Sequence, residues 1–424
     1  MGGMHHSALR FTGVGALSQA ILDLDGSLPE TPLRSALDQI SARLPILHGR
    51  VARDWLNLAP YWKLPRRAGG NPISLRVVDL PSDAAAEAQR LLADHVNQPL
   101  APPSDHLSFL LIRLGNQRSR LGMVFDHRLF DAIGAESFLR LIDQTWQGNL
   151  DQIAPKVKLT EPAHLDHWSR RFRSGKLLNA GLLKLAEREV CALKMPAAGS
   201  SPRVRFCHAS LTIEQTERFR QRAAAECGMP ILLPSAAARA VLSLQHAIPI
   251  MPLPGQQYLV FTSASTRAAG QEWESLFFNH LSFLPFSIDV DPPQSPTALV
   301  LKLRDQLFEQ MRQGIPAALQ DASALVRICP HWLGSRLMGR MFKGRLCSFY
   351  FACLRETGFP ERTFLGLPAV DLIHTPTAFA PPGMNLCMTT FGDRFNLVLS
   401  YLDGVLEDSA AAAMMGHFKS LLVE

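Results

Sequence analysis

The chain has 424 residues, of which 47% are hydrophobic and 19% are charged. These fractions are ordinary for a globular protein and exclude intrinsic disorder over most of the chain. Lys and Arg exceed Asp and Glu by 43 − 37 = 6. This mild excess suits an anionic ligand but does not indicate nucleic-acid binding, and the length predicts two to three domain-sized units.

The seven cysteines are odd in number, none has CxxC spacing, and no histidine cluster accompanies them. We therefore expect reduced thiols, with neither a disulfide framework nor a metal site. The first residues lack a basic region followed by an apolar stretch, so we expect no signal peptide. The longest charge-free run, Val241–Thr266, contains three prolines and is not expected to span a membrane. These features predict a cytoplasmic protein.

In chain order, the first predicted strand covers residues 20–24 and is followed by a helix. Thr31 is the expected N-cap and Pro32 the first helical residue, with an apolar stripe that begins at Leu33. A second helix is predicted over residues 83–96. Two apolar runs, 107–114 and 121–125, have the pattern of a β-hairpin, and the second is apolar throughout, as in a strand buried on both faces.

The stretch 194–203 is rich in Pro, Gly, Ala and Ser and predicts a crossover linker between an N-terminal lobe, 1–193, and a C-terminal lobe, 204–424. The strands predicted beyond it are 205–211, 258–263, 280–290, 348–354, 369–374, 384–390 and 394–401. The helices predicted there are 213–227, 234–246, 295–313 and 408–422. Mixed helices and strands in both halves indicate an α/β or α+β fold.

The strongest candidate for chemistry is the pair His127 and Asp131, with Gly134 three residues further on. The pair lies in the turn between a buried strand and a helix, where side chains project into clefts. Histidine is the side chain best suited to accept a proton near neutral pH. An HxxxD pair also arises often by chance, so on the residues alone a packed or solvated histidine stays the alternative.

Phe125–Gly134 resembles the HxxxD motif of the acyltransferase superfamily that includes chloramphenicol acetyltransferase, the condensation domains of nonribosomal peptide synthetases, and the wax ester synthases. Further segments resemble the same superfamily in its order: LRSALDQISARLPILHGRV, NQPLAPPSDHLSFLLIRL, STRAAGQEWESLFFNHLSFLPFSIDV and GMNLCMTTFGDRFNLVLSYLDGVLEDSAAAAMMGHFKSLL. Together they cover most of the chain and indicate a divergent standalone member.

The resemblance implies two chloramphenicol acetyltransferase-like lobes with a tunnel between them. It implies acyl transfer from a thioester, either acyl-CoA or an acyl group on carrier-bound phosphopantetheine, to a hydroxyl or amine of a small molecule. His127 would be the general base, and Asp131 would form a structural ion pair with Arg267. No permanently bound cofactor is implied, and an acyl or peptidyl carrier protein would act in trans.

Other positions are weaker candidates. The candidates for oxyanion or substrate contacts are Ser263, Ser265, Thr266, Asn279 and Asp126. Asp126 stands where many condensation domains have a first histidine, and a solvated turn residue is its alternative role. The candidates for phosphate or carrier-protein contacts are Arg336, Arg340, Lys343 and Arg345, for which a solvated helix face is the alternative.

Two departures from the superfamily leave a second function open. Asp126 replaces the first histidine, and Ala132 replaces the glycine that usually follows the motif aspartate. Retention of both His127 and Asp131 favours an acyltransferase. The two replacements favour a catalytically silent condensation-like module that binds a carrier protein or a partner enzyme.

Overall fold

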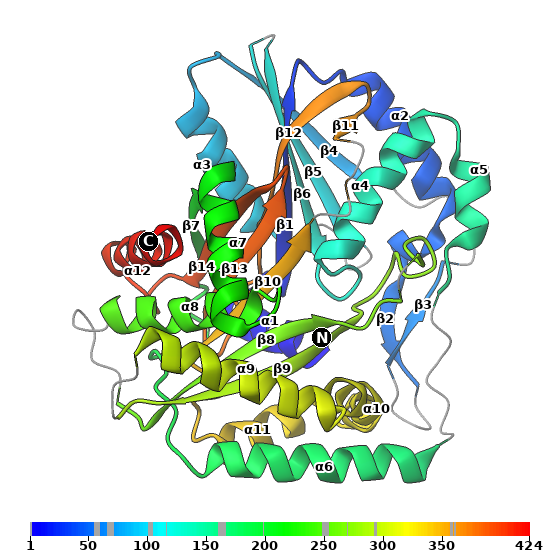
Figure 1. Cartoon of the computed structure of the whole chain (residues 1–424). Helices are drawn as coiled ribbons and strands as arrows, with labels where there is room; N and C mark the ends of the chain where they lie inside the picture. The colour runs from blue at the N-terminus through cyan, green and yellow to red at the C-terminus, as the bar shows by residue number, and fades with distance from the viewer. Residues whose placement is uncertain are drawn as a thin grey trace.

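The computed structural model describes residues 2–424 except 55–59, 66–71, 101–104, 116, 160–166, 198, 248–253, 269, 292–294, 357–358 and 360–361. Two six-stranded sheets dominate the fold, each with its own apolar core (Figure 1). Among the described residues, no helix is both long enough and apolar enough to cross a membrane. All seven cysteines are free thiols in this structure.

The first sheet is covered by helices on both faces, which explains why its central strands read as continuous apolar runs. Its strands lie in the order β11 (Thr363–Phe364), β12 (Leu367–Thr375), β1 (Leu17–Asp25), β6 (Arg118–Asp126), β5 (Leu107–Leu114) and β4 (Ser74–Leu80). Along β5, Phe109 and Leu111 face a core shared with α2 (Glu30–Arg43) and α4 (Ala132–Trp146), whereas Leu110 and Ile112 face α3 (Ala85–Val96). Short elements complete this part: η1 (Pro45–His48), α5 (Leu150–Ile153), η2 (Ala154–Lys156) and the ribbon of β2 (Arg50–Arg53) and β3 (Pro60–Lys63).

The predicted start of α2 is wrong by two residues. The N-cap is Pro29, whose φ is −73° and ψ 136°, and the helix begins at Glu30. Glu30 accepts from Arg34 Nη2 at 2.6 Å, a pair one helical turn apart. Thr31 therefore lies within the first turn and does not cap the helix.

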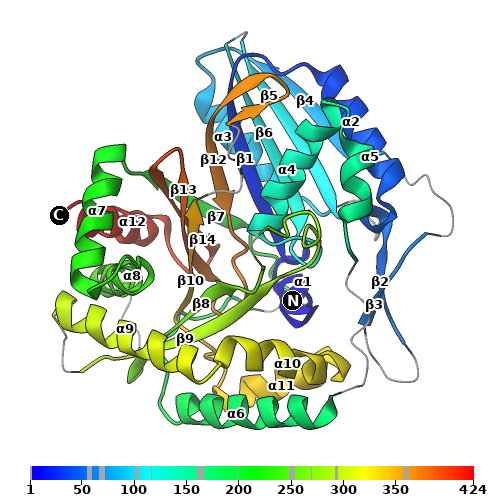
Figure 2. The same ribbon diagram turned by 45° about the vertical axis from the view of Figure 1, so that its right-hand side comes forward.

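The second sheet has the order β7 (Val204–Ser210), β14 (Arg394–Leu402), β13 (Met384–Phe391), β10 (Phe349–Glu356), β8 (Gln257–Ser265) and β9 (Leu281–Asp289). Its main core lies under α7 (Ile213–Cys227), α8 (Leu233–Ala247), α9 (Pro296–Arg312) and α12 (Asp408–Val423). A smaller core lies between this sheet and the helices α1 (Gly2–Thr12), α6 (Trp168–Ala186) and α11 (His331–Met341), and α10 (Ile315–Ile328) packs on α6 (Figure 2). The α7 start agrees with the sequence, because Thr212 and Gln215 form a reciprocal capping box.

The predicted division into lobes 1–193 and 204–424 does not follow the sheets in two respects. The helices α1 and α6 lie in the N-terminal half of the sequence but pack on the second sheet. β12 pairs antiparallel with β1, with Asp23 opposite Asp371, so residues 363–375 belong to the first sheet although they lie in the C-terminal half. A strand joins the sheet in which its apolar side chains become buried, and the side chain of Leu372 packs in the core of the first sheet. The linker 194–203 contains residue 198, which lies outside the described residues.

Candidate active site

The motif loop begins where β6 leaves the first sheet. Asp126 is the last residue of that buried strand, and the main-chain N–H of His127 donates to Ala16 O at 3.0 Å. The N–H of Leu129 then donates to Asp126 O at 2.9 Å, which closes a tight turn before Phe130. The turn therefore places His127 at the end of the sheet with its backbone fixed.

Asp131 is fully buried, and it has three donors. Its Oδ1 accepts from the main-chain N–H of Gly134 at 2.9 Å and so caps α4. Its Oδ2 accepts from Arg267 Nη1 at 2.6 Å and from the N–H of His280 at 3.0 Å. The ion pair predicted between Asp131 and Arg267 is thus present, with both side chains almost entirely removed from solvent.

The segment between β8 and β9 holds the motif loop from the C-terminal half of the chain. Phe278, at a left-handed φ of 71°, donates its N–H to Leu129 O at 2.5 Å. The Asn279 side chain donates through Nδ2 to the main-chain carbonyl of His127. Phe130 forms an isolated bridge with Phe278. Two segments about 150 residues apart in sequence therefore fix one another around His127.

Gly134 lies at the closest approach of these segments. A Cβ atom there would be 2.7 Å from the carbonyl oxygen of Leu276 and 3.3 Å from Arg267 Nη2. Because the nearest atom belongs to the backbone, a side chain would force the two segments apart. The glycine is needed for close packing rather than for a special backbone conformation.

The His127 ring lies among aromatic side chains. Ring centroids of Phe125 and Phe379 lie 6.2 and 5.8 Å from it, and Phe379 in turn contacts Tyr350 edge-on at 5.5 Å. Burial lowers the pKa of His127 below its usual 6.5, an effect that nearby Asp131 partly opposes. Burial therefore favours the neutral imidazole, which is the form that accepts a proton.

Two polar atoms at this site are buried without a hydrogen-bond partner among the described residues. They are Nδ1 of His127 and Oδ1 of Asn279. Buried polar groups are normally paired, so unpaired ones need an explanation, of which a bound molecule is one.

Asp126 is buried, so its alternative role as a solvated turn residue is wrong. Its Oδ2 lies 3.0 Å from His106 Nδ1 and accepts from Arg128 Nη2 at 2.6 Å, and its Oδ1 lies 3.7 Å from His5 Nδ1. Burial alone would raise the pKa of Asp126, but the hydrogen bonds from His106 and Arg128 outweigh it and hold that pKa well below its usual range. This carboxylate therefore fixes the start of the motif loop through His106 and Arg128.

His106 is the functional-region residue that the sequence analysis missed. It is 2% exposed, and its Nε2 lies 2.5 Å from Gly49 O. His106 and Asp126 are twenty residues apart in sequence, and no helical or strand periodicity predicts a contact at that separation. β5 and β6 form a hairpin, and Asp126 donates its N–H to His106 O at 3.0 Å, so the hairpin brings them together.

The remaining oxyanion candidates occupy the end of β8 and the turn after it. Ser263 lies opposite Phe283 in the β8–β9 ladder. Ser265 Oγ accepts from the N–H of Arg267 at 3.2 Å, and Thr266 donates its N–H to His280 O at 2.8 Å. Ser265 and Thr266 thus shape the turn that presents Arg267, and an oxyanion donor stays a prediction.

The basic candidates lie on another part of the molecule. Arg336 and Arg340 are exposed on α11, and Lys343 is exposed in the turn after it. Arg345 differs, because its Nη1 pairs with Glu189 at 2.5 Å and also donates to Pro254 O at 3.3 Å. Contact of these residues with phosphates or a carrier protein stays a prediction.

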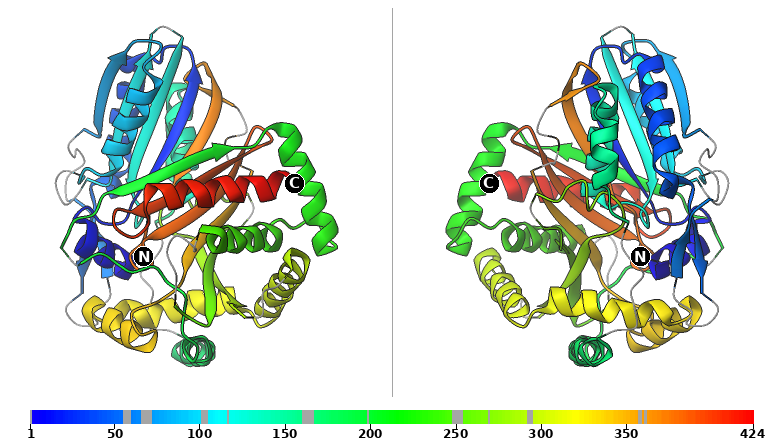
Figure 3. Two further views of the ribbon diagram at one scale, coloured as in Figure 1. Left: turned by 90° about the vertical axis from the view of Figure 1, so that its left-hand side faces the viewer. Right: turned by 90° about the vertical axis from the view of Figure 1, so that its right-hand side faces the viewer.

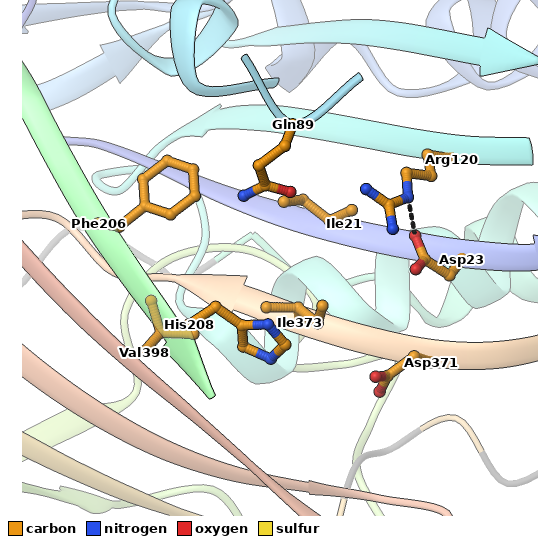
Figure 4. Close-up of a pocket in the computed structure, with 9 residues that line it drawn as sticks. All are labelled: Ile21, Asp23, Gln89, Arg120, Phe206, His208, Asp371, Ile373 and Val398. Carbon is orange, nitrogen blue, oxygen red and sulfur yellow. Dashed lines mark ion pairs between the residues drawn. The ribbon is translucent and has the colours of Figure 1, made fainter. Parts of the chain in front are cut away.

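Two cavities lie among the described residues away from His127. One, of about 120 Å³, lies between the first sheet and β7 and β14, where Asp23 faces Arg120, His208 and Asp371 (Figure 4). Burial raises the pKa of Asp23 to about 6. The other, of about 150 Å³, lies between α3 and the strands β4 and β5. The tunnel between the lobes therefore stays a prediction.

No protein-family model matches the chain, and no curated protein matches its sequence. Solved structures match over nearly the whole chain. The first condensation domain of the calcium-dependent antibiotic synthetase, in complex with a substrate analogue, is 18% identical with a TM-score of 0.68, covering 100% of this chain and 94% of that one. The starter condensation domain of rhizomide synthetase, in complex with C8-CoA and Leu-SNAC, is 13% identical with a TM-score of 0.64, covering 99% and 92%.

A third match is the epimerization domain from the third module of tyrocidine synthetase B. It is 12% identical with a TM-score of 0.61, covering 96% of this chain and 90% of that one. The chain therefore has the two-lobe, chloramphenicol acetyltransferase-like fold of condensation domains, as the sequence resemblance implies. The same fold carries condensation and epimerization domains, so the reaction must be argued from the site.

Proposed function

We propose that this chain is an acyltransferase that moves an acyl group from a thioester, acyl-CoA or a carrier-bound phosphopantetheine, to a hydroxyl or amine acceptor. The observation that carries the proposal is His127 on a loop held from both halves of the chain, where its own Nδ1 and the Oδ1 of Asn279 are buried without a partner among the described residues. The fold shared with a starter condensation domain solved with C8-CoA supports a thioester donor.

In the proposed reaction, a neutral ring nitrogen of His127 takes the proton of the acceptor O–H or N–H as that atom attacks the thioester carbonyl. The new C–O or C–N bond forms, the C–S bond breaks, and the imidazolium returns the proton to the leaving thiolate. Positioned base catalysis of this kind contributes about 10²–10⁴-fold. Asn279 Oδ1, which is buried and unpaired among the described residues, would accept a hydrogen bond from the substrate.

In this proposal Asp131 does not take part in proton transfer. Both of its oxygens already accept hydrogen bonds, and it holds α4, Arg267 and the main chain of His280 together. Its role is to fix the loop geometry, on which orientation of the two substrates depends. The donor and the small-molecule acceptor are the expected partners, and a carrier protein would bind in trans in the cytoplasm.

A silent condensation-like module is the second candidate. The Asn279 amide and the Ser265 hydroxyl, both candidates for contact with an oxyanion, are engaged with the main chain. Asp126 is likewise engaged with His106 and Arg128 rather than with the space beside His127. These engagements favour a protein that keeps the fold and binds a carrier without turnover.

The test uses the full chain with a panel of acyl-CoAs and acylated carrier proteins, together with amine and alcohol acceptors. Thiol release and product mass are measured for wild type, His127→Ala and the control His246→Ala, which changes a histidine on α8. Loss of transfer in His127→Ala alone supports the acyltransferase. Transfer that survives His127→Ala above a tenth of the wild-type rate refutes the assignment of the base. Carrier binding without any transfer supports the silent module.

A further inference from the structure

α6 and α11 form an outer face of the molecule whose composition the proposed function does not explain. α6 runs along the outside of α10 and α11 in Figures 1 and 2, and the side views of Figure 3 show it end-on beneath them. None of its 19 residues is buried. The large apolar side chains exposed on the two helices are Phe172 (62%), Leu177 (41%), Leu183 (49%), Trp332 (63%) and Leu337 (53%).

The two helical segments carry positive charge and no acidic residue. α6 has five Lys and Arg residues, and residues 331–345 have four; neither segment contains Asp or Glu. Three of the nine are engaged: Arg170 pairs with Asp321 at 3.1 Å, Arg345 pairs with Glu189, and Arg171 has a partner. The other six are exposed and form no ion pair with a described residue: Arg173, Lys176, Lys184, Arg336, Arg340 and Lys343.

Apolar and basic side chains are interleaved along the outer side of α6. Phe172, Lys176 and Leu183 follow helical spacing on one ridge, and the exposed Arg173, Leu177 and Lys184 follow it on the next. The opposite side of α6 faces the protein and carries the half-buried Leu178, Leu182 and Leu185. Leu182 and Leu185 pack on the smaller core beside the second sheet. At the start of the helix, Trp168 stacks on Phe172 with ring centroids 5.6 Å apart.

We propose that the outer face of α6 and α11 binds peripherally to the surface of an anionic phospholipid membrane. Trp, Phe and Leu beside Lys and Arg are typical of helices that lie in the membrane interface, where the apolar groups enter the headgroup region and the cations meet lipid phosphates. A helix of 19 residues presents about 28 Å of nearly straight face, which suits an extended surface.

The first test is co-sedimentation of the full chain with vesicles of phosphatidylcholine alone and of phosphatidylcholine with about one third phosphatidylglycerol. Wild type should bind the anionic vesicles and release at high salt. The triple variant Arg173→Gln, Lys176→Gln, Lys184→Gln should lose at least about tenfold in partition coefficient. Because these side chains are exposed and unpaired among the described residues, the melting temperature should stay the same.

The matched charge control is Arg76→Gln, Lys156→Gln, Arg218→Gln, which removes three exposed cations on β4, η2 and α7. It should bind anionic vesicles as wild type does. The apolar arm compares Phe172→Ser, which should weaken vesicle binding severalfold, with Ile213→Ser, an equally exposed residue (56%) on α7 that should not.

Three results would overturn the proposal: no preference of wild type for anionic over neutral vesicles, equal losses in the α6 and control variants, or binding of an acidic carrier protein that depends on α6 while vesicles are not bound. The last result would reassign the face to protein docking. Vesicle binding is measured without turnover, so this test stands or falls separately from the acyltransferase assignment.

Discussion

Removal of the Asp131 carboxylate tests whether its contacts with Arg267 and His280, which join the two halves of the chain, stabilise the fold. In Asp131→Ala, three donors lose their acceptor: the N–H groups of Gly134 and His280 and the guanidinium of Arg267. The Arg267 side chain is only 8% exposed and would keep a hydrogen bond to Ser275 O at 3.0 Å. A buried charge would thus remain with one neutral partner.

The expected magnitude follows from these contacts. Breaking a buried ion pair by removal of one partner lowers the free energy of unfolding by about 3–5 kcal/mol, and loss of an N-cap adds about 1 kcal/mol. Arg267→Ala should be milder than Asp131→Ala, near the lower end of about 3–5 kcal/mol, because two N–H donors still stabilise the carboxylate. The double variant should be less destabilised than the sum of the single variants, since the broken pair is counted twice in that sum.

The assay is urea unfolding followed by tryptophan fluorescence and circular dichroism, with all three variants compared at one pH. Asp79→Ala is the control, because Asp79 and Arg113 form an ion pair at 2.6 Å in which the carboxylate is 71% exposed, and its loss should leave the midpoint nearly unchanged. Strict additivity, or an Asp131→Ala change of less than about 1 kcal/mol, would refute the reasoning.

Three further outcomes are expected. Desolvation lowers the pKa of His127, so kcat/KM should rise with pH to a plateau with a midpoint below 6.5; a midpoint above 6.5 would contradict a desolvated base. Gly134→Ala places Cβ 2.7 Å from Leu276 O and should lower the free energy of unfolding by about 1–3 kcal/mol. The control is Gly416→Ala, at a helical glycine with open space around it, which should not lower that free energy. Equal effects of the two variants in urea unfolding would argue against a tight contact at Gly134. Asp23 has a folded-state pKa raised to about 6, so its contribution to stability is present below pH 4 and is lost as pH rises through 6. The free energy of unfolding of Asp23→Asn, relative to that of wild type, should therefore be higher at pH 7 than at pH 4 by roughly 1–3 kcal/mol. A difference that does not change with pH would contradict the raised pKa.

The order of most elements and the position of the motif could be predicted from the sequence, whereas α1, β4 and α10 were not predicted. Apolar runs and helical periodicity report whether a segment is buried on one face or two, which is why α7 begins and ends where its pattern predicts. His127 and Asp131 stood out because a strand, a turn and a helix follow one another there. The Asp131–Arg267 pair was expected from the resemblance, and the geometry confirms it.

Only the tertiary structure decided which segments meet. β12 joins β1 across some 350 residues of sequence, and no local pattern encodes that partner. The same reason explains Asp126, which reads as a turn residue until the hairpin brings His106 against it and α1 brings His5. Periodicity along one element specifies what must be buried, whereas the partner that buries it is set by packing of elements distant in sequence.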